Sequence, residues 1–527
     1  MKNTLLLCLA SLASLWLALH VAAGMGCSRP DAATAPATPM GAPAEQPPLE
    51  LPEREIWEVI TLSGHRVGHG FMRAAYTTVE GQRLLRVEAR HYLAVQRFDT
   101  ATRARLEASS LQTPDGKLRQ FQIQLHQSDT PQVVSGEVIG DRLHIDLRAL
   151  GRRQSKQLKW PADAGGLTAV EDSLLLRPLR LGEQRTVQGF DLSAATVVAY
   201  QLRAVAQQTT ELLGGQQRVL LRVEAESQTE GKTLAKMVFW CDEQGQVLKT
   251  QLEGSLRLES YRVPRAEALK AIGPAAIDLG IDIAVRPQHP LPERFASDAH
   301  GTRRVQYRVW LKEGSAAEVF RAGLTQQVEA VDQHTARITV RSIRPGQPID
   351  QSAADDDPPT EADRGPSLFV QSDDELIRLL ANRAAGQETQ PARLAIALEK
   401  YVHQYIKNKE FTRGFATAAE VARTAEGDCT EHAVLLCALL RARGIPARAA
   451  IGLIYMQDRQ AFGYHMWTEA HIDGFWIPLD AMTGRGGIGA AHLKIDHTSL
   501  EGPTAYARFL PVLRIAGQLG IEVEQAE

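Results

Sequence analysis

The stretch Gly427-Asp428-Cys429-Thr430-Glu431-His432 predicts the start of a helix with a cysteine in its first turn. Asp428 followed three residues later by Glu431 is the pattern of a capping box, which makes Asp428 the N-cap and Cys429 the first helical residue. At that position the helix dipole and the unpaired backbone N–H groups favour a thiolate and can bind a developing oxyanion. A small apolar residue that happens to begin a helix fits the same pattern, so this stretch alone leaves both interpretations open.

A strand pattern downstream supplies the partners that a thiol nucleophile needs. The residues from His465 to Ile472 alternate, and Asp473-Gly474 is typical of a two-residue hairpin turn. If the hairpin pairs Ile472 with Phe475, Asp480 falls on the same face as His465, one diagonal step away. Diagonal neighbours lie roughly 7 to 8 Å apart, within reach of a hydrogen bond from an imidazole to a carboxylate. The order Cys, His, Asp is the one that a nucleophile, its base and an orienting group require.

Four motifs follow one another in the last third of the chain: GDCTEH at 427–432, RARGIPAR at 441–448, YHMWTE at 464–469 and WIPLD at 476–480. Together they resemble the bacterial transglutaminase-like superfamily, whose core resembles that of papain-type cysteine proteases. By this resemblance Cys429 is the nucleophile, His465 is the general base and acid, and Asp480 orients the imidazole. The resemblance spans residues 366–500, implies an α+β catalytic core, and assigns only the backbone N–H of Cys429 to an oxyanion.

The resemblance implies acyl transfer on amide bonds of proteins or peptides through a thioester on Cys429. Transfer of the acyl group to water makes a peptidase or amidase, and transfer to an amine makes a crosslinking transglutaminase. We favour hydrolysis because no basic or acidic acceptor groove is visible in the sequence. A non-catalytic envelope protein that binds peptides is a third alternative, and the complete set of three residues argues against it. Trp467 and Trp476 are expected beside the site, as cleft wall or core.

The cysteines and histidines indicate neither a disulfide framework nor a metal site. Five cysteines occur in 527 residues, and Cys241 and Cys437 are expected to be buried free thiols. The histidines and cysteines near Cys429 lack the short paired spacing of a typical zinc site, so no metal and no cofactor is expected. His432 is expected on the helix surface or in the core beside the site, and His471 is expected to be a solvated strand residue.

Residues 1–26 have the pattern of an export signal, with Lys2 ahead of an apolar run that small residues terminate. Cys27 resembles the lipidated cysteine of bacterial lipoproteins, although Gly24 stands where the usual leucine would be. Cleavage without lipidation and retention as an uncleaved membrane anchor stay open. The expected location is the cell envelope, as a lipoprotein that is anchored to the membrane through its N-terminus and faces the periplasm.

Composition and patterning divide the rest of the chain. With 44% hydrophobic and 23% charged residues the chain is globular, and its net charge of -3 with only short basic clusters argues against nucleic acid as a partner. A protein or peptide substrate is the expected partner, and the sequence does not decide the oligomeric state. The predicted segments are a tether rich in Ala and Pro (27–50), a mainly antiparallel β domain (51–265), a small β region (275–345), an acidic linker (346–366), a transglutaminase-like catalytic domain (367–500) and a C-terminal tail (501–527).

Overall fold

The computed structural model of the protein describes most of the chain from Leu49 to Glu527. The predicted export signal, Cys27 and nearly all of the tether lie outside the described residues. Within the described part, no helix combines the length and the apolar character that are needed to cross a bilayer. The described residues are 49–97, 100–126, 131–149, 152–191, 196–229, 232–254, 256–272, 278, 282–349, 357–408, 416–501, 512 and 515–527.

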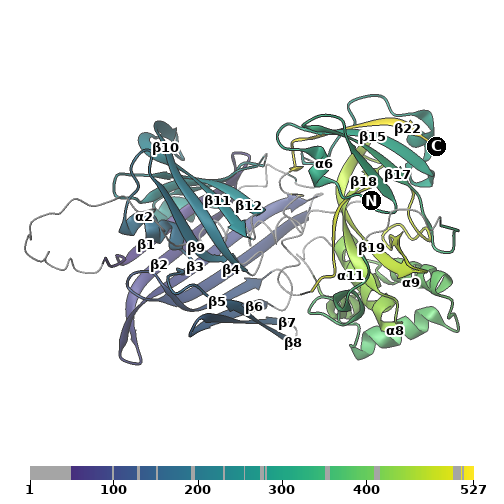
Figure 1. Ribbon diagram of the computed structural model, residues 1–527, viewed down its shortest axis with the longest axis horizontal. Coiled ribbons are helices and arrows are strands. Elements are labelled where there is room, and N and C mark those ends of the chain that lie inside the picture. Colours follow the sequence, from purple (N-terminus) through teal and green to yellow (C-terminus); the bar gives the residue numbers. More distant parts are fainter. Residues whose placement is uncertain are drawn as a thin grey trace, which may run out of the picture.

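One large antiparallel sheet holds the first half of the chain (Figure 1), as the alternating sequence pattern predicts. Over the described residues it has 14 strands, arranged as two meanders that join where β14 pairs with β1. Within each meander, strands that are consecutive in the sequence are neighbours in the sheet, because short turns connect them. The strands are β1 (Arg54–Leu62), β2 (His65–Val79), β3 (Gln82–Arg97), β4 (Thr100–Gln112), β5 (Leu118–His126), β6 (Gln132–Ile139), β7 (Arg142–Ala149), β8 (Arg152–Lys159), β9 (Gln184–Asp191), β10 (Thr196–Glu211), β11 (Gln217–Thr229), β12 (Lys232–Cys241), β13 (Val247–Leu252) and β14 (Leu258–Arg262).

The large sheet curls so that distant strands meet across one of its faces. Phe121 on β5 and Phe190 on β9 have ring centroids 5.0 Å apart, although β5 and β9 lie far from each other in the strand order. A sheet with one apolar face must bury that face, and curling lets the sheet cover itself. Two short helices, α2 (Ala169–Leu176) and α3 (Arg265–Ala268), belong to this part of the chain.

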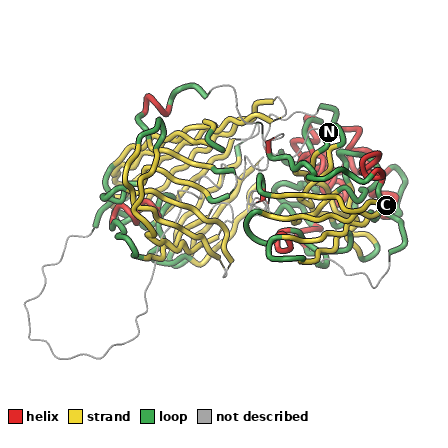
Figure 2. The backbone as a smooth tube through the Cα atoms, turned by 90° about the horizontal axis from the view of Figure 1, so that it is seen from above, coloured by secondary structure: helices red, strands yellow, loops and turns green. Residues whose placement is uncertain are grey.

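Helices and two small sheets form the second half, where the helices of Figure 2 gather. One four-stranded sheet has the order β16-β17-β15-β22 and the other has the order β20-β19-β18-β21. The strands are β15 (Arg304–Leu311), β16 (Gln326–Ala330), β17 (Thr335–Arg341), β18 (Ala447–Met456), β19 (Ala461–Ile472), β20 (Phe475–Leu479), β21 (His492–Thr498) and β22 (Leu519–Ala526). The helices are α5 (Glu293–Asp298), η1 (Ala299–Gly301), α6 (Ala316–Val319), α7 (Glu361–Arg364), α8 (Glu375–Ala385), α9 (Pro391–Tyr405), α10 (Ala418–Thr424) and α11 (Cys429–Ala442).

The last strand of the chain belongs to a sheet that begins more than 200 residues earlier in the sequence. β22 lies in the segment that the sequence analysis assigned to a tail, yet it pairs antiparallel with β15, with Ile521 opposite Val309. Ile521 and Val309 are both fully buried. A lone strand is hard to recognise in a sequence when its partner is so distant along the chain.

Helix α11 lies at the centre of the helical part. Its residues from Cys429 to Arg441 are all buried, between the other helices α8, α9 and α10 and the strands β18 and β19. A helix that is apolar all round must be enclosed in this way. Thr468 on β19 fixes the helix on the sheet, because its hydroxyl donates to the carbonyl oxygen of Ala433 at 3.1 Å.

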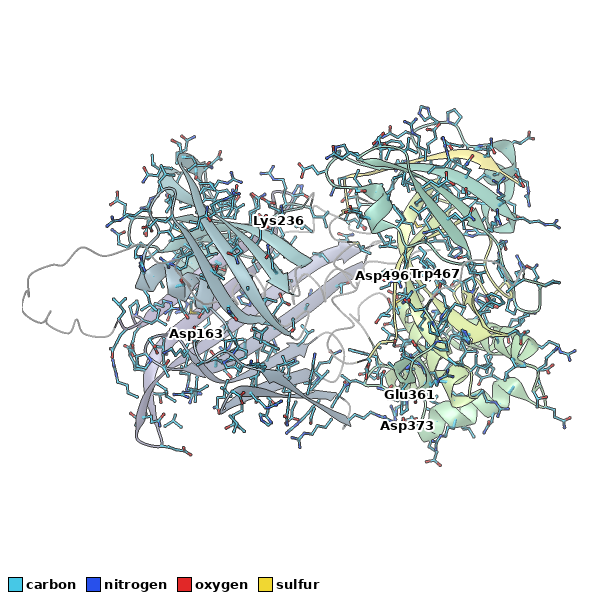
Figure 3. The ribbon with its side chains drawn as sticks, viewed as in Figure 1. Asp163, Lys236, Glu361, Asp373, Trp467 and Asp496 are labelled. Atoms are coloured by element: carbon cyan, nitrogen blue, oxygen red, sulfur yellow. The ribbon has the colours of Figure 1, made fainter. Side chains whose placement is uncertain are left out.

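An ion pair joins the large sheet to the helical part. Arg152, the first residue of β8, donates to the carboxylate of Asp373 at 2.5 Å and 3.2 Å. Asp373 is labelled at the lower edge of the helical part in Figure 3. Both side chains are partly exposed, so water screens the pair and its contribution to stability is about 1 kcal/mol at most.

Candidate active site

The first turn of α11 has the capping box that the sequence predicts. Asp428 Oδ1 accepts from the backbone N–H of Thr430 at 2.8 Å, and Glu431 Oε2 accepts from the N–H of Asp428 at 3.0 Å. Gly427 is required before this turn, since its φ is 145° and a Cβ there would lie 2.2 Å from the Cβ of Glu431. Cys429 is the first residue of the helix, and its exposed fraction is 0%.

Two buried neighbours of Cys429 stabilise the same turn. Burial, reinforced by the adjacent Asp428 carboxylate, raises the pKa of Glu431 well above its ordinary value. The second oxygen of Glu431 accepts from the N–H of Ala416 at 3.1 Å, which fixes the preceding segment. His432 Nδ1 lies 2.5 Å from the carbonyl oxygen of Asp428, so this nitrogen carries the proton that it donates. Both residues support the helix start, and His432 is in the core beside the site.

Strands β19 and β20 pair in the predicted register. Ile472 lies opposite Phe475, and Asp473-Gly474 forms the turn between the strands. Pro478 has no backbone N–H, and β20 tolerates it because β20 is the outer strand of its sheet. Asp480 follows the strand directly and continues its alternation, so the parity on which the predicted contact depends is confirmed.

His465 and Asp480 form a buried hydrogen bond. His465 Nε2 lies 2.9 Å from Asp480 Oδ2, and each side chain has an exposed fraction of 1%. Because an ionised carboxylate only accepts hydrogen bonds, Nε2 carries the donated proton. Any proton that the ring exchanges with a thiol must therefore pass through the other nitrogen, Nδ1. The contact expected between these two residues is present, while their catalytic roles stay predictions.

Several donors hold the Asp480 carboxylate in its ionised form. Burial alone would raise the pKa of Asp480, but the charge of His465 and the hydrogen bonds from His465 and His492 outweigh it and hold this pKa below its ordinary value. The N–H of Met482 also donates to Oδ1 at 2.9 Å. Asp480 is therefore an anion at neutral pH despite its burial.

Glu399 on α9 anchors the chain on both sides of the turn that follows Asp480. Its Oε1 accepts from the N–H of Asp480 and from the N–H of Gly487, each at 3.1 Å. On the same helix, His403 Nδ1 lies 3.0 Å from the carbonyl oxygen of Ala481. Burial raises the pKa of Glu399 to about 7, with hydrogen bonds from the backbone opposing it.

We expect Glu399→Gln to remove a decline in stability between pH 4.5 and pH 7. Because the folded state raises the pKa of Glu399, it keeps a proton that the unfolded chain releases in this interval, so the free energy of unfolding falls as pH rises. The decline is on the order of 1 to 3 kcal/mol. Urea unfolding of both proteins at several pH values measures it. The exposed Glu361 provides the control: Glu361→Gln should keep the wild-type slope, and an unchanged slope in Glu399→Gln would contradict the assignment.

A second histidine, which the sequence analysis did not single out, contacts the same carboxylate. His492, the first residue of β21, places its Nε2 3.3 Å from Asp480 Oδ2. Its ring packs against the rings of His465 and Trp467, at centroid separations of 5.8 Å and 5.3 Å. The alternation of polar and apolar residues from His492 to Asp496 is a strand signal that could have placed this histidine on one face with other polar groups.

The two tryptophans that the sequence predicts beside the site lie in different surroundings. Trp467 stacks with His465 at a centroid separation of 6.2 Å, and in Figure 3 its label falls between the sheet of β15 and β22 and the helices α8 and α9. Trp476 lies nearer the hairpin turn, with the guanidinium of Arg448 3.9 Å from its ring. Its indole N–H donates at 2.7 Å to the carbonyl oxygen of Asp357, a residue of the predicted linker. Trp467 is thus the tryptophan that contacts His465 and His492, whereas Trp476 packs against His471.

The sequence around the site matches a known protein family. Residues 378–481 match the model of the transglutaminase-like superfamily. The protein contains a transglutaminase-like superfamily domain. The matched residues of this domain include Cys429, His465 and Asp480, whereas His492 lies beyond them. A search of curated proteins finds no match to the chain.

Solved structures similar to the chain include proteins of three bacteria. A "putative cysteine protease" from Cytophaga hutchinsonii is 17% identical, with 42% of this chain and 86% of that chain covered and a TM-score of 0.27. A β-barrel-like protein of a domain of unknown function from Brucella abortus is 14% identical, with 41% and 96% covered and a TM-score of 0.30. A "putative protease" from Parabacteroides distasonis is 12% identical, with 67% and 64% covered and a TM-score of 0.18.

The transglutaminase-like domain and the strand that follows it also bring three potential metal ligands together. One donor atom each from His465, Asp480 and His492 lies within 4.8 Å of the other two. Two imidazoles and a carboxylate are a ligand set that zinc accepts. The sequence analysis expects no metal because the histidines and cysteines near Cys429 lack the short paired spacing of a zinc site, and it does not single out His492. The hydrogen-bond distances to Asp480 Oδ2 fit two N–H donors that share one acceptor.

Proposed function

We propose that this protein is a thiol enzyme that acts on amide bonds of proteins or peptides, with Cys429, His465 and Asp480 as its catalytic triad. The observation that carries the proposal is the buried 2.9 Å hydrogen bond between His465 and Asp480 within the transglutaminase-like domain. An imidazole that a carboxylate orients is a general base, and a cysteine that begins a long helix is a nucleophile favoured by the helix dipole. These are the parts that covalent acyl transfer needs.

The proposed reaction begins when the Cys429 thiolate attacks the carbonyl carbon of the amide. The carbonyl π electrons move to oxygen, and the backbone N–H groups at the start of α11 stabilise the resulting oxyanion. Collapse of this intermediate breaks the C–N bond while the His465 imidazolium gives its proton to the departing amine, leaving a thioester on Cys429. Water then attacks the thioester, His465 takes the proton of that water, and the carboxylic acid leaves as the thiolate is restored.

Water is the proposed acceptor of the acyl group. The exposed fractions of the Cys429 and His465 side chains are 0% and 1%, so a peptide needs an opening to reach them. A second amine substrate would need room for a further side chain in the same closed site, whereas water would not. This difference in size supports hydrolysis over crosslinking.

The proposed location of the enzyme is the bacterial cell envelope. The pattern of residues 1–26 supports export, and Cys27 supports attachment to the membrane through a lipid. The tether that follows would give the folded part reach from the membrane surface. Mass spectrometry of the mature N-terminus tests this, since an intact Met1 contradicts both processing and lipidation.

Incubation with a glutamine-containing peptide and a primary amine tests the reaction. We expect mass spectrometry to show new carboxylic acid products, because water is the proposed acceptor. Incorporation of the amine would support crosslinking in place of hydrolysis. The Cys429→Ala variant is the control that must show neither product, and a wild-type protein that fails on a broad panel of peptides would contradict the enzymatic proposal.

A further inference from the structure

His492 reaches the Asp480 carboxylate from the opposite edge of the sheet. The strand order is β20-β19-β18-β21, and Asp480 follows the first of these strands while His492 begins the last. Adjacent strands are about 4.8 Å apart, so the outer strands are separated by roughly 14 Å. Even so, His492 Nε2 lies 3.3 Å from Asp480 Oδ2, the same oxygen that His465 Nε2 meets at 2.9 Å.

The segment between Asp480 and His492 makes this contact possible by crossing the sheet. Ile488, within that segment, packs against Trp467 on β19. Gly452 on the intervening strand β18 makes room for the indole, because a Cβ there would lie 2.9 Å from the Trp467 ring. The Trp467 and His492 rings then meet edge to face at 5.3 Å. Packing against Trp467 therefore fixes the His492 ring. The hydrogen bond from His492 to Asp480 links the two ends of the segment that crosses the sheet.

The hydrogen bond from His492 leaves the charge of Asp480 intact. Burial lowers the pKa of His492, with the hydrogen bond to Asp480 opposing it, so the ring is neutral and gives its one N–H to the carboxylate. Oδ2 then has two donors, and Oδ1 has the N–H of Met482. This set of donors allows little rotation of the carboxylate. Because both imidazoles donate to Oδ2, the negative charge of this oxygen is shared between His465 and His492.

Other titratable groups surround the same carboxylate. Glu399 faces it from α9, and His300 from η1 packs against His492 at a centroid separation of 5.9 Å. Arg485, in the crossover, acts electrostatically on His300. Glu399, His300 and Arg485 form no hydrogen bond to Asp480 Oδ2, so among the described side chains the two histidines hold that oxygen.

We infer that His492 is a positioning residue of the proposed triad, which fixes the Asp480 carboxylate and moderates how strongly it holds the His465 imidazolium. The inference rests on the proposed function. Without His492, the carboxylate can turn away, which slows turnover. Its undivided charge also holds the imidazolium more strongly, which moves the alkaline limb of the pH profile to higher pH.

Substitution of His492 by Phe, Leu and Gln tests the inference through two pH profiles. The first is the rate of Cys429 alkylation by iodoacetamide, and the second is kcat/KM for a cleaved peptide. His492→Phe and the smaller His492→Leu both remove the donor, and we expect kcat/KM to fall about 10- to 100-fold with the alkaline limb moved to higher pH. His492→Gln keeps an N–H donor and should restore most of the rate and the wild-type profile. His497, on the same strand, gives the control His497→Phe, which should change neither profile.

The outcomes separate the two proposals. If wild-type Cys429 is not alkylated faster than the other thiols and no peptide is cleaved, the proposed function fails. If the wild type reacts but folded His492→Phe or His492→Leu keeps its rate and profile, only the role of His492 fails. The positioning role is also contradicted if His492→Gln loses as much activity as His492→Phe while the two variants have equal thermal stability. If the purified wild type contains one zinc ion per chain and His492→Gln does not, His492 is a metal ligand and the positioning role is wrong.

Discussion

We expect Cys429→Ala to lose all measurable peptide turnover and still unfold near the wild-type temperature. The thiolate forms the covalent bond in the proposed reaction, so its loss removes the reaction path, and nucleophile substitutions in triad enzymes cost up to about 10⁶-fold in rate. The small, buried side chain contributes little to packing beyond its sulfur atom. Activity assays together with thermal unfolding separate loss of chemistry from loss of fold.

Cys437 provides a matched control on the same helix. It is also fully buried, and burial raises its pKa to about 11, so it is a protonated thiol at neutral pH. Cys437→Ala should keep wild-type turnover. In the intact protein at pH 7, iodoacetamide should alkylate Cys429 well before Cys437 or Cys241, whose pKa burial also raises. Equal alkylation rates for the three thiols would contradict the assignment of Cys429 as the nucleophile.

We expect Asp480→Ala to reduce kcat/KM on the order of 10²- to 10⁴-fold. The substitution removes the acceptor that orients His465 through Nε2, and it removes the charge that stabilises the imidazolium. It also leaves the N–H groups of His465 and His492 without their buried acceptor, so the free energy of unfolding should fall by about 1 to 3 kcal/mol. Steady-state kinetics and urea unfolding measure the two effects.

Asp480→Asn distinguishes orientation from charge. The amide oxygen can still accept a hydrogen bond from His465, so part of the activity should return. The amide has no charge to hold the imidazolium, so the alkaline limb of the pH profile should move to lower pH. If Asp480→Ala keeps wild-type kinetics, Asp480 does not belong to the triad.

Local sequence signals predicted the helix start and the hairpin of the candidate site. The Asp428 and Glu431 pair lies within one helical turn, and the Asp473-Gly474 turn fixes the register of the strands on either side of it. Because side chains alternate along a strand, the register was enough to place Asp480 on the face of His465. Each of these features depends on a few neighbouring residues, which is why the sequence alone sufficed.

The supporting groups could not be predicted in the same way. Glu399 lies 81 residues before Asp480, and its role depends on which face of α9 turns toward the sheet. His492 reaches Asp480 only because a crossover returns the chain to the other edge of the sheet, and no periodicity reports the path of a connection. The alternation that begins at His492 is typical of a strand, but it does not identify the neighbours of that strand.

The pairing of β22 with β15 affects both the folding of the chain during synthesis and the behaviour of truncated fragments. During synthesis, β15 emerges about 200 residues before its partner, so the small sheet keeps one open edge until the whole transglutaminase-like domain has been translated. A fragment that stops at Leu500 would retain that open edge, with unpaired backbone groups on β15 available to other chains. Expression of such a fragment would therefore favour aggregation, and a truncation that retains β15 also has to retain the strand from Leu519 to Ala526.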